Sequence, residues 1–183
     1  MKNTFRKSMA LLALVAVIAL AFTGCKKDSS SSSSGGGGGG NIPTGDYGTV
    51  TVAGQTYHIA LAGYEAYYDD ELSQYFVTIV LADRTNIQTA NMVELAIVGA
   101  QNLPASGTYQ YTIQDPMPAG SCGGMLSSPQ NGDLICIDGT LTVSGTSDNY
   151  TINTSGSATP FGTCGGQEMP FSVHFEGPLM QGR

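Results

Sequence analysis

The main part of this chain has almost no basic residues. After residue 41 it contains no lysine and only two arginines, Arg84 and Arg183, against thirteen aspartates and glutamates, a net charge of −11. A strongly acidic surface repels phosphate backbones and anionic lipid headgroups. We therefore expect no nucleic-acid partner, a soluble domain, and tolerance of nearby divalent cations.

The motifs of common catalytic sites are also missing. The chain has no tryptophan, no G-x-S-x-G motif and only two histidines, His58 and His174. Each histidine alternates with apolar neighbours, which predicts an outward position on a strand. An enzyme would need one of them within hydrogen-bond reach of Ser, Cys or Asp. We therefore expect no catalytic residue. Of the three functional hypotheses for this chain, an enzyme ranks last.

No apolar run is long enough to span a membrane as a helix. The longest, Met9–Phe22, has fourteen residues, whereas a spanning helix needs roughly 20. It follows the basic residues Lys2, Arg6 and Lys7 and precedes small residues. This layout predicts a cleavable signal peptide over residues 1–24.

The residues after this run resemble the lipobox of bacterial lipoproteins. They read Phe-Thr-Gly-Cys at 22–25, with Phe22 where Leu is usual. The resemblance implies that Cys25 is lipidated, that the signal is cut before it, and that the new amino terminus is acylated. Several acyl chains give stable membrane anchoring. The alternative is an ordinary signal followed by a cysteine by chance.

Residues 25–41 are expected to be a flexible tether. Six serines (Ser29–Ser34) precede six glycines (Gly35–Gly40), a composition typical of flexible coil with a reach of about 20 Å. Lys26, Lys27 and Asp28 resemble the export signal of surface lipoproteins in Bacteroidota, which usually has two acidic residues. The resemblance implies an outer-membrane protein displayed on the cell surface.

Residues 42–183 are predicted to form a single all-β domain. Apolar residues recur with a period of two, as at Val50 and Val52, and "QYFVTIVLA" (74–82), apolar on both faces, indicates a central strand. We expect about eight antiparallel strands without a helix, in a β-sandwich or a lipocalin-like barrel. In "DLICIDGTLTV" the apolar residues keep one parity, which predicts one long strand with a bulge or bend at Gly139.

The carboxyl-terminal part is similar to known proteins of unassigned activity. "GTLTVSGTSDNYTI" (139–152) and "HFEGPL" (174–179) resemble the closing strands of small uncharacterised β-rich lipoproteins from gut Bacteroidota. The resemblance implies an eight-stranded sandwich or lipocalin-like barrel and supplies no functional residue.

Two similar segments carry cysteines, "GSCGG" at 120–124 and "GTCGG" at 162–166. Both are predicted to lie in long connections at one end of an up-and-down fold. A disulfide between Cys122 and Cys164 fits an exported protein. The alternatives are a cysteine nucleophile elbow, a metal site, and a bridge that uses Cys136, which is otherwise a free thiol.

"YEAYYDDELSQY" (64–75) combines tyrosines with carboxylates. Aromatic rings and carboxylates suit stacking on sugars or oxygen ligation of calcium, although no cofactor is otherwise expected. The alternative is a solvated acidic hairpin loop whose tyrosines cover the sheet. The candidate binding residues are Tyr64, Tyr67, Tyr68, Asp69, Asp70 and Glu71.

The leading functional hypothesis is a lipid-anchored binding or adhesion module for an extracellular glycan or protein. Long loops on a rigid sheet are where binding residues concentrate. The alternative is a lipocalin-like carrier that holds a small apolar ligand inside the barrel. The carrier predicts an unfilled interior.

Overall fold

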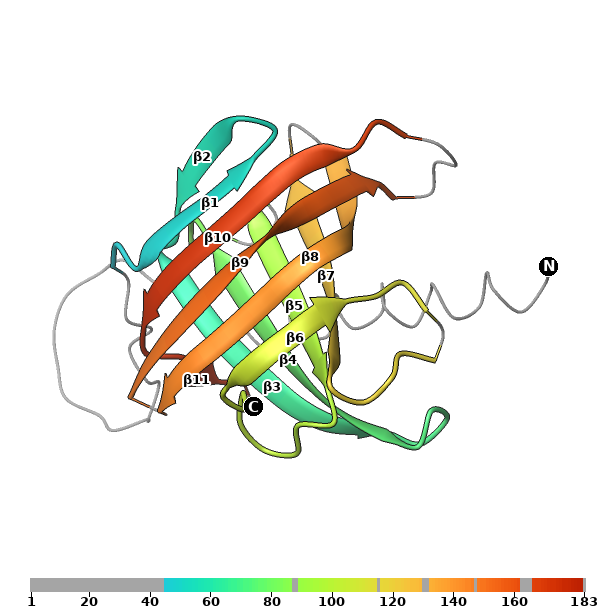
Figure 1. Cartoon of the computed structure of the whole chain (residues 1–183). Helices are drawn as coiled ribbons and strands as arrows, with labels where there is room; N and C mark the ends of the chain where they lie inside the picture. Colours follow the sequence, from blue (N-terminus) through green and yellow to red (C-terminus); the bar gives the residue numbers. More distant parts are fainter. Residues whose placement is uncertain are drawn as a thin grey trace, which may run out of the picture. The chain divides into compact units, whose positions relative to one another are not determined.

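The computed structural model describes residues 45–86, 89–114, 116–129, 132–146, 148–161 and 166–182. In these residues 66% are strand and none is helix, which confirms the all-β class (Figure 1). No helix able to cross a membrane occurs among them. The strands are β1 Gly48–Val52, β2 Gln55–His58, β3 Leu61–Asp69, β4 Gln74–Ala82, β5 Met92–Val98, β6 Gly107–Tyr111, β7 Ser121–Ser128, β8 Gly132–Thr146, β9 Asn149–Pro160, β10 Met169–Gly177 and β11 Met180–Gln181.

The strands form one curled mixed sheet, a half-barrel, in the order β11-β3-β4-β5-β7-β6-β8-β9-β10-β1-β2. The expectations of about eight strands, of a two-sheet sandwich or closed barrel, and of purely antiparallel pairing were wrong. Much of the difference comes from segments expected to be loops or connections, because β3 covers part of the predicted acidic loop and β7 covers most of the first cysteine segment. β6 pairs parallel with β7, and β11 pairs parallel with β3.

The chain joins the two halves of the sheet at one corner. Between β2 and β3, the Ile59 N–H donates to the Gly48 carbonyl at 2.8 Å, and the Ala60 N–H donates to the Ala82 carbonyl at 2.9 Å. The two consecutive residues thus bind the two opposite halves of the sheet. This corner fixes where β3 starts and therefore where the β3–β4 hairpin points.

The core fills the concave side of the sheet. β10 shows the expected alternation, with Phe171, Val173 and Phe175 buried and their neighbours exposed. β4 is buried on both faces from Phe76 to Ala82 and lies between β3 and β5, which confirms that this segment is a central strand. Burial of these apolar side chains, at about 25 cal/mol per Å², is the main stabilising term.

The single long strand predicted around Gly139 is confirmed. β8 runs for 15 residues, and its register with β9 shifts between Cys136 and Asp138, next to the predicted position. Gly139 has a φ of +118°. The bulge bends β8, whose first part pairs with β7 and whose later part pairs with β6.

The first cysteine segment was expected to lie in a loop. Instead, its residues Ser121–Gly124 lie in β7. Gly124 faces Tyr111 and the Cys136 Sγ so closely that a Cβ at this position would contact both at 2.8 Å. The glycines therefore allow side chains from neighbouring strands to fill the space above β7. The segment was expected to lie in a connection, whereas here its glycine pair serves close packing inside the sheet.

Candidate functional site

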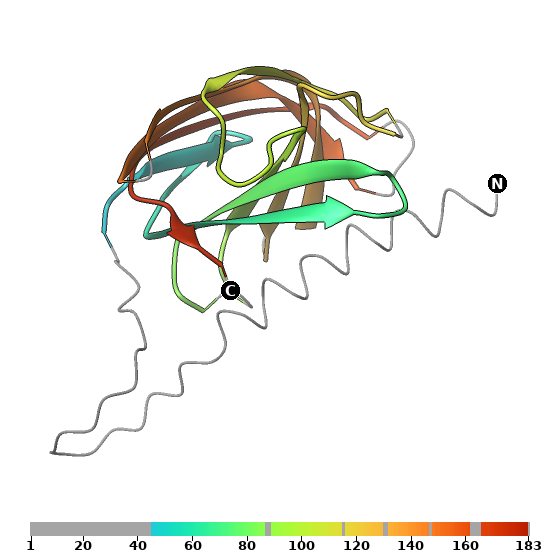
Figure 2. The same ribbon diagram turned by 90° about the horizontal axis from the view of Figure 1, so that it is seen from below.

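The β3–β4 hairpin extends beyond the neighbouring strands (Figures 1 and 2). Its strands pair without a register shift from Leu61 opposite Ala82 to Asp69 opposite Gln74. In the turn, the Leu72 N–H donates to Asp69 Oδ1 at 2.9 Å, and Ser73 has a φ of +53°. The Gly99 N–H donates to the Tyr75 carbonyl at 2.8 Å. The end of β5 therefore holds the hairpin where it leaves the sheet.

Two aromatic pairs line the hairpin, one on each face. Tyr68 and Tyr75 lie opposite each other with ring centroids 4.7 Å apart, and they are 46% and 42% exposed. Tyr67 stacks on Phe76, at 5.4 Å and an interplanar angle of 12°. Burial raises the pKa of Tyr67 to about 12, and nearby carboxylates contribute to this rise. The Tyr68–Tyr75 pair thus presents aromatic surface to solvent, whereas Tyr67 is half-buried and protonated at neutral pH.

The residues predicted as one binding cluster are divided by the pleat. Tyr64 is only 7% exposed and belongs to the core. Tyr67 and Asp69 share one face, Tyr68 lies on the other, and Asp70 and Glu71 are exposed in the turn. The predicted set omitted Tyr75 and Phe76. The register of the hairpin supplies both, because each is the direct cross-strand partner of a predicted tyrosine.

No group of three or more His, Cys, Asp and Glu side chains in the described part of the chain is arranged to hold a metal ion. The carboxylates of the hairpin follow the strand and its turn, so they do not converge on one point. Calcium ligation at Tyr64–Glu71 has no support in this arrangement.

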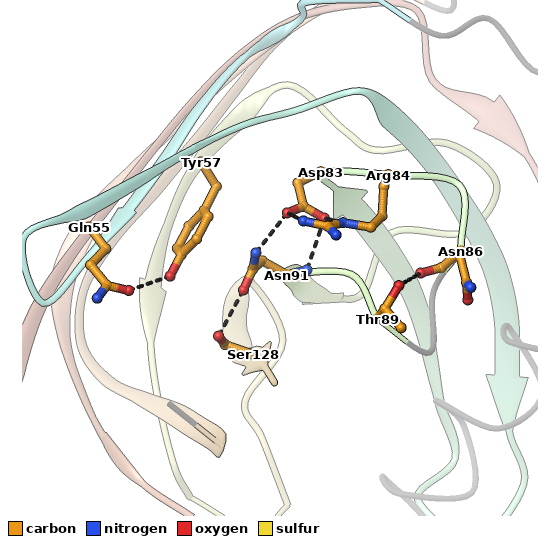
Figure 3. Close-up of polar contacts among 8 residues, drawn as sticks. All are labelled: Gln55, Tyr57, Asp83, Arg84, Asn86, Thr89, Asn91 and Ser128. Atoms are coloured by element: carbon orange, nitrogen blue, oxygen red, sulfur yellow. Dashed lines mark hydrogen bonds and ion pairs between the residues drawn. The ribbon is translucent and has the colours of Figure 1, made fainter. Parts of the chain in front are cut away.

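A second polar cluster organises the loop between β4 and β5 (Figure 3). Asp83 accepts hydrogen bonds from the Arg84 guanidinium at 2.9 and 2.8 Å, and from the Asn91 backbone and side-chain N–H groups at 3.0 and 2.7 Å. Asn91 Oδ1 accepts one from the Ser128 hydroxyl at 2.7 Å. Burial by itself raises the pKa of Asp83, but these hydrogen bonds outweigh it and lower the pKa. Through these hydrogen bonds the Asp83 carboxylate holds the loop in place.

The interior near this loop contains little free space. Val50, Tyr57, Asn91, Leu126 and other residues line a pocket of about 10 Å³, room for about one water molecule. A side chain that lines an empty cavity keeps accessible surface on the cavity wall. Core residues of the central strands have no accessible surface at all, namely Val77, Ile79, Leu81, Leu95, Ile97, Cys122, Leu141 and Ile152. Around these residues the interior is packed.

Both histidines point outward, as predicted. His58 Nδ1 lies 3.1 Å from Asp46 Oδ1 at the surface, and His174 Nδ1 lies 2.7 Å from Asn153 Oδ1. Among the described residues, neither imidazole has a Ser or Cys side chain as a hydrogen-bond partner. His58 therefore meets the hydrogen-bond criterion through Asp46, in a pair whose side chains are both 71% exposed.

The cysteines that the structure describes are free and buried. Cys122 and Cys136 are thiols with no exposed surface. Cys164 and Cys25 lie outside the described residues, so a bridge from Cys164 to Cys122, lipidation of Cys25 and the tether over residues 25–41 stay predictions. Burial raises the pKa of Cys122 to about 12 and that of Cys136 further above its ordinary value.

We expect both described thiols to be inert in the folded protein, because the thiolate is the reactive form. Iodoacetamide at pH 8 should leave Cys122 and Cys136 unmodified until guanidinium unfolds the chain, and peptide mass spectrometry would locate the label. Labelling of either cysteine in the folded protein would contradict this. After unfolding without reductant, an unlabelled Cys122 would show that it is bridged.

Comparisons with known proteins identify no relative: no protein-family model, curated protein or solved structure matches the chain.

Proposed function

We propose that this protein is an outer-membrane lipoprotein, anchored through Cys25, that displays a binding module for an extracellular glycan or protein on the cell surface. The observation that carries the proposal is the exposed Tyr68–Tyr75 pair at the end of a projecting hairpin. Tyrosine offers a large apolar contact surface at a low entropic cost, and it is common among residues that dominate binding energy.

The surroundings of the pair support the same function. Asp70 and Glu71 are exposed next to it and supply acceptors for sugar hydroxyls or for donors of a protein partner. The packed interior around the central strands favours binding at the surface over the carrier alternative. The short polar tether would give the hairpin room to reach its partner.

The proposal is tested by replacing both tyrosines, Tyr68→Ala with Tyr75→Ala, in the full-length protein on whole cells. Arrays of glycans and of extracellular proteins would first identify what the wild-type cells bind. We expect the double variant to bind that partner about 30-fold more weakly, since a loss of about 2 kcal/mol is typical of a tyrosine hot spot.

The matched control is Ile113→Ala, because Ile113 is also exposed, at 64%, but lies outside the hairpin. Surface display of each variant is measured with an antibody to an epitope tag. If the double variant binds as well as the control, the hairpin is not the binding site and the proposal fails.

A further inference from the structure

One edge of the sheet is open beside the candidate site. β3 pairs with β4 over nine residues, but on its other side it pairs only with β11, at Gly63 and Tyr64. Figure 2 shows β3 at the border of the sheet with β11 beside its first part. In an antiparallel pair, alternate residues direct their N–H and C=O groups away from the partner. Glu65–Asp69 therefore presents backbone donors and acceptors that no described strand pairs with.

This edge has few of the features that usually prevent strand addition, because it carries the charged residues Glu65 and Asp69 but no lysine, proline or bulge. Natural edge strands are often very short, or carry lysine, proline or a bulge. The segment Glu65–Asp69 reads "EAYYD" without lysine or proline, and its register with β4 has no bulge. β2, at the opposite edge of the sheet, is a strand of only four residues. The open part of β3 is thus the better template for a further strand.

The side chains of the edge select for positive charge. Glu65, Tyr67 and Asp69 alternate on one face, and opposite charges across a strand pair are stabilising, whereas like charges are destabilising. The nearest arginine along the chain, Arg84, is paired with Asp83. A second copy of this chain, paired antiparallel about Tyr67, would place Glu65 against Asp69. Charge therefore disfavours self-pairing.

We propose that the open edge Glu65–Asp69 of β3 binds an extended segment of a partner protein with Lys or Arg at alternate positions, which adds a strand to the sheet. Backbone hydrogen bonds would give affinity, and the alternating side chains would give specificity, as in other cases of strand addition. The inference rests on the proposed function, because it names the partner class of the same hairpin.

The test uses the full-length lipidated protein in detergent and a nine-residue peptide of alternating Lys and Val. Hydrogen exchange should slow at Glu65–Asp69 when the peptide is added. Two comparison peptides are used. The first is the same peptide with N-methyl groups on alternate residues, so it cannot donate backbone hydrogen bonds along one edge. The second alternates Glu and Val, so it has the wrong charge. We expect both comparison peptides to bind at least about tenfold more weakly. Equal binding of the N-methylated peptide, or no protection at the edge, would overturn the inference.

Two charge reversals separate edge pairing from general attraction. Glu65→Lys changes the edge, and Glu176→Lys makes the same change at an exposed position of β10, outside the hairpin. We expect Glu65→Lys to weaken binding of the Lys and Val peptide about tenfold and Glu176→Lys to weaken it about twofold at most. Equal effects would overturn the inference. If the peptide fails while Tyr68→Ala with Tyr75→Ala still weakens whole-cell binding as expected, the edge inference falls and the proposed function stands.

Discussion

Gly139→Ala is expected to lower the free energy of unfolding by about 3–5 kcal/mol, because it combines backbone strain with overpacking. Gly139 has a φ of +118°, and a Cβ there would overlap the Ser155 carbonyl oxygen of β9. Its cross-strand partner is also a glycine, Gly156, whose Cβ would overlap the Asp138 carbonyl. Neither position has room for a methyl group unless β8 and β9 separate. Urea unfolding followed by circular dichroism measures the loss.

The control for this substitution is Gly54→Ala in the β1–β2 turn. Gly54 also has a positive φ, +80°, but no atom lies within 4 Å of the position that a methyl group would take there. Strain alone should cost about 1 kcal/mol at this turn. If the two variants lose the same stability, the close approach of β8 and β9 at Gly139 is not the cause.

Glu94→Gln is expected to stabilise the protein by up to about 3 kcal/mol above pH 7 and by much less near pH 4.5. Glu94 is 7% exposed, lies opposite Val80 and Met125, and has no hydrogen-bond partner among the described residues. Burial raises its pKa to about 7. The folded state therefore keeps this proton up to about pH 7, whereas the unfolded chain releases it near pH 4.5.

This difference in proton binding decides how the stability of the wild type changes with pH. As pH rises from about 4.5 to 7, the unfolded state is increasingly favoured by ionisation of Glu94, so the wild type loses stability in this window. The uncharged glutamine removes that loss. Urea unfolding of both proteins at pH 4.5 and 8 measures it, with the exposed Glu176→Gln as the control. A stability difference that does not change with pH would contradict the burial of this carboxyl group.

The candidate site was only partly visible in the sequence. The combination of tyrosines and carboxylates marked the hairpin that carries the proposed site, because side-chain chemistry is local information. The position along the hairpin then decided which tyrosines are available: Tyr64 and Tyr68 lie on the same face of β3, but Tyr64 is in the core whereas Tyr68 lies in the exposed end of the hairpin. The open edge of β3 could not be predicted, because it depends on where β11, more than 110 residues later, stops pairing.

The sequence by itself determined the all-β class, the central position of β4, the outward histidines and the long bulged β8. Each of these depends on the alternation of side chains along one segment. The tertiary structure alone decided the curled mixed sheet, the parallel placement of β6 and β11, and the position of Cys122 inside β7. The physical reason is that pairing between strands distant in sequence depends on how side chains fill the shared core. The glycines of β7 show this directly, because they leave space for Tyr111 and Cys136.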